Sequence, residues 1–159
     1  MKHQKNTGKS ILSHLGDAGF LVILGGGESG VGTAILGKQK RYKVFVSDKG
    51  EITKAYKKVL LQHQIDFEEN QHSEDIILTA DVVVKSPGIP DTVPLVQKLV
   101  KNAVPVISEI EFAAAFTKAK LIAITGSNGK TTTTLLAHHI LEEAGLNVED
   151  LQALNVETN

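Results

Sequence analysis

Short apolar runs alternate with helical stretches through most of this chain, and this alternation narrows the possible folds to very few. The apolar runs, which we expect to be strands, lie at 20–24, 42–48, 81–85 and 104–107, with helical patterns at 31–40, 52–63, 91–102 and 109–116. Strands and helices at this spacing predict an α/β fold, a Rossmann-like parallel sheet with flanking helices. Right-handed crossovers place every strand's carboxyl end at one edge, so the loops that follow the strands should converge there.

A further apolar run at 121–124 leads into a loop rich in glycine and hydroxyl groups, followed by a helical pattern over 130–144. Such a loop lets backbone N–H groups turn toward an anion, and the helix adds the positive end of its dipole. Lys130 can reach the outer phosphates of a nucleotide, and the Thr131 hydroxyl can hold Mg²⁺. The loop is shorter than a standard phosphate loop, because Ile124 stands where the first glycine is expected. The alternative is a left-handed glycine turn with Lys130 in solvent.

Gly25-x-Gly27-x-x-Gly30 follows the first expected strand and opens a helix, the context of a dinucleotide-binding fingerprint. Asp48 ends the next strand, near the offset expected of an acid that contacts a ribose or base. The spacing leaves the nucleotide open, and tight helix–strand packing without a ligand is the alternative. Two phosphate-binding loops in one chain indicate two phosphorylated ligands.

Composition excludes several classes of function. A net charge of -1 gives no support for a nucleic-acid partner, and no apolar run approaches the roughly 20 residues that span a bilayer. The chain has no cysteine, so disulfides and thiolate metal sites are excluded. Residues 1–10 are basic but precede no long apolar segment, so we expect a frayed polar leader rather than a secretory signal.

Four segments together resemble the Mur ligases of peptidoglycan synthesis, and among them the D-glutamate-adding branch. They are Leu24-Gly-Gly-Gly-Glu-Ser-Gly-Val-Gly32, Val44-Phe-Val-Ser-Asp48, Lys85-Ser-Pro-Gly-Ile-Pro90, and Ile107-Ser-Glu-Ile-Glu-Phe112 leading into the phosphate loop. The resemblance implies an ATP- and Mg²⁺-dependent carboxylate–amine ligase that joins D-glutamate to UDP-N-acetylmuramoyl-L-alanine through an acyl phosphate. It also implies a cytoplasmic, monomeric enzyme without a nucleic-acid or membrane partner.

The resemblance also implies roles for individual residues and segments. The UDP moiety would contact Glu28, Ser29, Gly30, Asp48, Lys49, Ser86, Pro87 and Gly88. The ATP phosphates would contact Ser127, Asn128, Gly129, Lys130, Thr131 and Thr132, with Lys130 as the catalytic group and Thr131 on Mg²⁺. Residues 1–116 would form the UDP-substrate domain, 117–120 a linker, and 121–159 the beginning of a truncated ATP-binding domain.

The chain departs from the family near its end, where 149–159 lack the usual Gly-Asn-x-Gly loop and Asn155 stands in a different context. We therefore expect an amino-terminal fragment that binds the UDP substrate and catalyses nothing alone. Two other functions stay open: an NAD-binding module of an oxidoreductase, and a small P-loop regulator. Glu109 and Glu111 are interpreted as acids that complement a helix dipole, and His72 as a surface residue.

Overall fold

The computed structural model describes residues 19–148, so the expectations for residues 1–10, for 149–159 and for Asn155 lie outside the described residues. The chain divides into two compact units, residues 1–118 and 119–159. In the described part of the chain, no helix is both long and apolar enough to cross a membrane.

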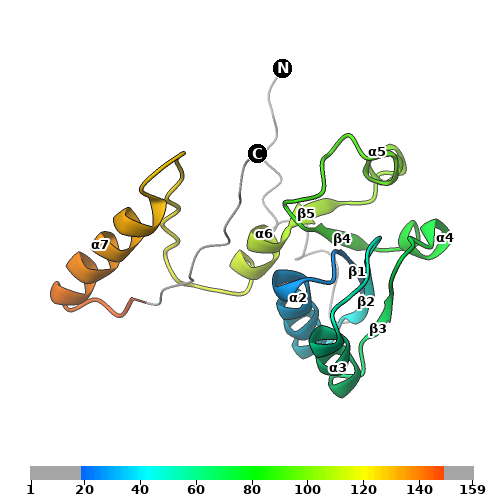
Figure 1. The fold of residues 1–159 in the computed structure, drawn as a ribbon, viewed down its shortest axis with the longest axis horizontal. Coiled ribbons are helices and arrows are strands. Elements are labelled where there is room, and N and C mark those ends of the chain that lie inside the picture. Colours follow the sequence, from blue (N-terminus) through cyan, green and yellow to red (C-terminus); the bar gives the residue numbers. More distant parts are fainter. Residues whose placement is uncertain (1–18, 149–159) are drawn as a thin grey trace. The chain divides into compact units, whose positions relative to one another are not determined.

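The first unit is a five-stranded parallel sheet with the order β3-β2-β1-β4-β5 (Figure 1). Its strands are β1 (Phe20–Leu24), β2 (Lys43–Ser47), β3 (Asp66–Glu68), β4 (Val82–Lys85) and β5 (Val106–Ser108). The expected Rossmann-like sheet is confirmed. The chain order reverses between β1 and β4, and in open α/β sheets ligands bind outside the strand ends at such a point.

Helices cover both faces of this sheet (Figure 1). One face carries α2 (Glu28–Gln39), α3 (Lys54–Gln62) and α6 (Glu109–Ala114), and the other carries α4 (Glu74–Ile77) and α5 (Pro94–Lys101). Leu21 and Ile23 of β1 face the first layer, whereas Val22 and Leu24 face the second. This alternation follows from the two-residue period of a strand, and burial on both faces explains why β1 is uniformly apolar.

The element boundaries differ from the expected ones where local chemistry sets them. Helix α2 begins at Glu28, inside the glycine loop, rather than at residue 31. Helix α5 begins at Pro94 rather than at residue 91, because a residue before proline is held extended, as Val93 is here. Strand β3 and helix α4 had no counterpart in the expected elements; they contain only three and four residues.

In the second unit, α7 (Lys130–Glu143) forms at the expected place. Gly145 has a φ of 77°, its N–H donates to the Glu142 carbonyl, and the Leu146 N–H donates to the Leu141 carbonyl, the Schellman ending of a helix. The strand expected at 121–124 is wrong for this structure, because these residues adopt no regular secondary structure. A strand needs a hydrogen-bonded neighbour, and the sheet of the first unit contains β1 to β5 alone.

Candidate functional site: two glycine loops that open helices

The loops after β1, β2 and β4 meet at the carboxyl edge of the sheet. The Gly25 N–H donates to the Ser47 carbonyl at 3.0 Å, and the Ser86 N–H donates to the Leu24 carbonyl at 3.0 Å. The Asp48 carboxylate accepts from the Gly26 N–H at 2.6 Å. The expected convergence of these loops is confirmed, and it brings together the segments that contain the candidate UDP contacts.

Two glycines give the first loop its shape. Gly25 has a φ of +112°, a conformation that other residues rarely adopt. A Cβ on Gly30 would lie 2.0 Å from the Gly25 carbonyl oxygen, so this position admits no side chain while the loop keeps its form. Gly30 therefore brings α2 close against the end of β1, the role of the third glycine in such loops.

The first turn of α2 offers backbone donors to an anion. Its N-cap is Gly27, and no side chain caps the helix. The first bond of the helix runs from the Val31 N–H to the Gly27 carbonyl at 2.9 Å, so residues 28–30 precede the first intrahelical donor. Such leading N–H groups have no carbonyl partner within their own helix, and together with the helix dipole they form an anion-binding site.

The Ser29 side chain is hydrogen-bonded to Glu109, an acid at the start of α6. Its hydroxyl lies 2.9 Å from Glu109 Oε1, across 80 residues of sequence. Glu109 is buried, with only 4% of its surface exposed, and burial raises the pKa of its carboxyl, although the Ser29 hydrogen bond lowers it in part. Glu109 does lie in the first turn of α6, as interpreted from the sequence, but its side chain is buried. Glu111 does act as expected, since it completes a capping box with Ser108.

The other candidate uridine contacts flank this turn. Both oxygens of the Asp48 carboxylate shape the loops, since Oδ1 accepts from the Gly50 N–H at 2.7 Å while Oδ2 holds Gly26. Lys49, Pro87 and Gly88 are exposed, and Ser86 is half-buried.

The turn after β4 is closed by the amine of Lys85. This amine donates to the Ile89 carbonyl at 2.5 Å and pairs with Asp91 at 3.2 Å. The turn that contains Ser86, Pro87 and Gly88 is thereby held in place from both of its ends.

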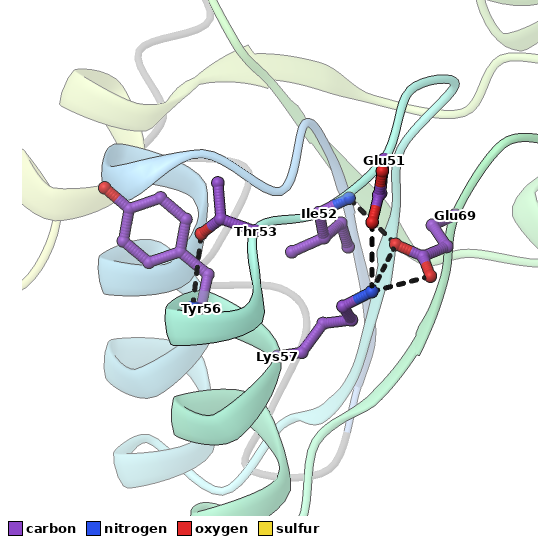
Figure 2. Close-up of polar contacts among 6 residues, drawn as sticks. All are labelled: Glu51, Ile52, Thr53, Tyr56, Lys57 and Glu69. Carbon is purple, nitrogen blue, oxygen red and sulfur yellow. Dashed lines mark hydrogen bonds and ion pairs between the residues drawn. The ribbon is translucent and has the colours of Figure 1, made fainter.

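A polar clamp that sequence reasoning missed holds the loop between β2 and α3 (Figure 2). The Glu69 carboxylate accepts from the Ile52 N–H at 2.8 Å and from the Lys57 amine at 2.9 Å, and Lys57 also pairs with Glu51 at 3.8 Å. Their hydrogen bond lowers the pKa of Glu69 and raises that of Lys57. Because the buried Ile52 side chain packs against Gly26, the clamp supports the first glycine loop.

A second missed cluster lies under the end of β2. The buried Ser47 hydroxyl is 2.6 Å from Glu68 and 2.7 Å from His72 Nδ1. A carboxylate only accepts and a hydroxyl has one hydrogen, so Ser47 donates to Glu68 and receives the Nδ1 hydrogen of His72. Burial lowers the pKa of His72, which favours its neutral form. His72, interpreted from the sequence as a surface residue, is half-buried in this cluster.

Burial also affects Glu68, but hydrogen bonding decides its protonation. Burial acts to raise the pKa of this carboxyl, whereas hydrogen bonds from Ser47 and Ser73 lower it by more, so the pKa lies below its ordinary value of 4.5. Glu68 is therefore ionised at neutral pH, as the donor assignment of Ser47 requires.

The second glycine loop opens α7 in a similar way. Its N-cap, Gly129, has a φ of 75° and no side chain caps the helix. The first helical bond joins the Thr133 N–H to the Gly129 carbonyl at 2.9 Å, so the N–H groups of residues 130–132 precede it. The Lys130 amine lies over the loop, 2.6 Å from the Gly126 carbonyl.

The remaining candidate ATP contacts are open to solvent. Ser127, Asn128, Thr131 and Thr132 are exposed. Within residues 19–148, no group of three or more histidine, cysteine, aspartate or glutamate side chains is placed to hold a metal ion.

Comparison with known proteins gives a consistent result. Residues 21–93 match the family model of the MurD N-terminal domain. The chain is 56% identical over 127 residues to the UDP-N-acetylmuramoylalanine–D-glutamate ligase of Christiangramia forsetii, covering 80% of this chain and 28% of the relative. It is 57% identical over 128 residues to the ligase of that name from Bacteroides thetaiotaomicron, covering 80% and 29%. The chain thus spans between a quarter and a third of the length of these relatives.

Solved structures of similar proteins share this fold. The UDP-N-acetylmuramate–alanine ligase of Thermotoga maritima aligns with a TM-score of 0.55 at 25% identity, over 80% of this chain and 30% of that one. A pseudomurein peptide ligase type C from Methanothermus fervidus aligns with a TM-score of 0.54 at 29% identity, over 87% and 29%.

Proposed function

We propose that the chain belongs to the family of the MurD N-terminal domain, whose model matches residues 21–93, and that it forms part of a ligase of peptidoglycan synthesis. The proposed reaction is the ATP-dependent addition of D-glutamate to UDP-N-acetylmuramoyl-L-alanine. In this proposal residues 1–116 bind the UDP substrate, 117–120 link, and 121–159 begin the ATP-binding domain. The names and identities of the two relatives support the reaction.

The uncapped first turn of α2 is the observation that most strongly supports UDP binding. The N–H groups of residues 28–30 lie beside the point where the strand order reverses, and the loops that contain Asp48 and Ser86 are bonded to the same segment. A diphosphate would take the amide donors. The uridine would then lie against the exposed surface of Lys49, Pro87 and Gly88.

The loop that opens α7 suits the triphosphate of ATP. Its three leading N–H groups and the Lys130 amine are donors without a competing side-chain cap, and the exposed Thr131 hydroxyl would be the protein's ligand to Mg²⁺. The cation, when bound, neutralises charge on the transferring phosphoryl group. Lys130 would exchange the Gly126 carbonyl for a phosphate oxygen and hold it as a point charge.

Calorimetric titration of the 159-residue chain tests the first half of the proposal. We expect UDP-N-acetylmuramoyl-L-alanine to bind and NADH to produce no saturable heat. UMP and uridine are the comparison ligands, since UMP keeps the base with one phosphate and uridine keeps the base with none. We expect affinity to fall from UDP-N-acetylmuramoyl-L-alanine to UMP and from UMP to uridine. Equal affinity for all three compounds would show that the N–H groups of residues 28–30 do not bind the phosphates. Tight NADH binding without a response to the UDP compound would establish the oxidoreductase alternative instead.

A further inference from the structure

A buried acid lies directly behind the proposed diphosphate site. Glu109 is the first residue of α6, is 4% exposed, and contacts the Ser29 hydroxyl through Oε1 at 2.9 Å. Its other oxygen, Oε2, is buried without a hydrogen-bond partner among the described residues. An ionised carboxylate in this position leaves a desolvated charge unmatched, which is costly.

The charges around Glu109 do not compensate for this burial. Helix α2 and strands β4 and β5 pack against α6. The pKa of Glu109 is raised by burial and lowered in part by the Ser29 hydrogen bond. Strand β5 has no charged residue. The other charged groups on α2, β4 and α6 are Glu28, Lys38, Lys85 and Glu111. Lys40 and Arg41 follow α2, and Asp81 precedes β4. Lys85 is paired with Asp91, and Glu111 is bonded to Ser108.

The Ser29 hydroxyl has one hydrogen, and the protonation of Glu109 decides where it points. If Glu109 is ionised, it can only accept, so Ser29 donates to it and presents lone pairs to a ligand. If Glu109 is neutral, the acid can donate to Ser29 and the hydroxyl hydrogen turns outward. A phosphate oxygen only accepts, so Ser29 can bond to a phosphate only in the second arrangement.

We propose that Glu109 is a positioning residue for the anionic ligand, which it serves in the neutral form by donating to Ser29 while Ser29 donates to a phosphate oxygen. Ligand binding is then accompanied by uptake of a proton from solvent onto Glu109, and Ser29 retains one hydrogen throughout. The inference rests on the proposed binding of a UDP compound at α2. The new element is that Glu109, which does not contact the anion, prepares the site for it by acting through Ser29.

Proton uptake is measured by calorimetry in two buffers of different ionisation enthalpy. The ligand is UDP-N-acetylmuramoyl-L-alanine, whose diphosphate is a diester and does not titrate near neutral pH, unlike the terminal phosphate of UDP. We expect the 159-residue chain to take up as much as about one proton per ligand at pH values above the pKa of free Glu109. Over the same range the affinity should fall by as much as about tenfold per pH unit.

Glu109→Gln is the decisive variant, because its amide can donate to Ser29 as the neutral acid does but cannot take up a proton. We expect uptake to vanish and the affinity to become independent of pH. Glu111→Gln is the matched control on the same helix and should behave like the wild type. If Glu109→Gln fails to fold, the carboxyl carbon shift of wild-type Glu109 is titrated by NMR with and without ligand, and its pKa should rise on binding.

The outcomes separate this inference from the proposed function. Binding of the UDP compound with equal uptake in the wild type and in Glu109→Gln, or with an unchanged pKa of Glu109, overturns the role of Glu109 alone. Absence of binding by the wild type overturns the UDP site itself and the inference with it.

Discussion

Replacing Gly30 by alanine tests how tightly the first glycine loop is built. The added Cβ would lie 2.0 Å from the Gly25 carbonyl oxygen and 3.0 Å from its carbon, and real Cβ contacts essentially never fall under 3.0 Å. The backbone must therefore separate by about 1 Å, since 3.0 minus 2.0 is 1.0. Overpacking of this kind costs about 1–3 kcal/mol, while alanine in place of glycine within a helix returns about 0.5–1 kcal/mol. We expect a net loss of up to about 2.5 kcal/mol of unfolding free energy, with about 1 kcal/mol at the centre of these ranges.

Gly32→Ala is the matched control, because the same change two residues later in α2 meets nothing within 4 Å. It should gain about 0.5–1 kcal/mol, so the two variants should differ by the overpacking cost alone. Urea denaturation followed by tyrosine fluorescence reports on the first unit, since the chain has two tyrosines and no tryptophan, and both Tyr42 and Tyr56 lie in it. A Gly30→Ala variant as stable as Gly32→Ala would refute the close approach of α2 to β1. Gly30→Ala should also weaken UDP-compound binding, and Gly32→Ala should not.

Three further changes test other parts of the structure. In a full-length ligase, Lys130→Ala should abolish acyl-phosphate formation and leave affinity for the UDP substrate nearly unchanged; a collapse of that affinity in calorimetry would contradict the separation of the two loops. Phe112→Ala should cost about 3–5 kcal/mol in urea denaturation, because this buried ring packs edge-on against two other aromatic rings. Glu68 and Glu69 have folded-state pKa values below 4.5, so their contribution to stability is present above pH 4.5 and is lost as the pH falls through those lower values. The double Gln variant should show a smaller fall in urea midpoint than the wild type between about pH 6 and about pH 3.

The main elements were predictable because local and tertiary preferences agree. The apolar runs at β1, β2 and β4 are buried on both faces of the sheet, which is the only environment that suits them. Strand β3 was missed because its three residues alternate charge and ring at a sheet edge, too short a pattern to recognise. The strand expected at 121–124 does not form, although its local apolar pattern is strong, because no strand in the described part of the chain pairs with it.

The meeting of the candidate loops was predictable from topology, whereas the polar contacts beneath them were not. Ser29 and Glu109 are 80 residues apart, Ser47 and His72 are 25 apart, and Ile52 and Glu69 are 17 apart. Each pair depends on how two helices or loops pack in three dimensions, and each acid or histidine has an ordinary surface interpretation in its local sequence. Only the fold decides which of these side chains becomes buried.

The two glycine loops both open a helix, but they differ in how many contacts hold them in place. Both helices begin at an uncapped glycine and leave three leading N–H groups for an anion. Around α2, however, the loop is held by Ser47, Asp48, Ser86 and the Glu69 clamp acting through Ile52. Around α7 the loop is contacted locally, by the Lys130 amine at the Gly126 carbonyl. Because binding is weakened by the entropy of ordering a loop, the first site should bind its anion with little rearrangement. The second, whose preceding residues 121–124 adopt no regular secondary structure, should pay a larger ordering cost.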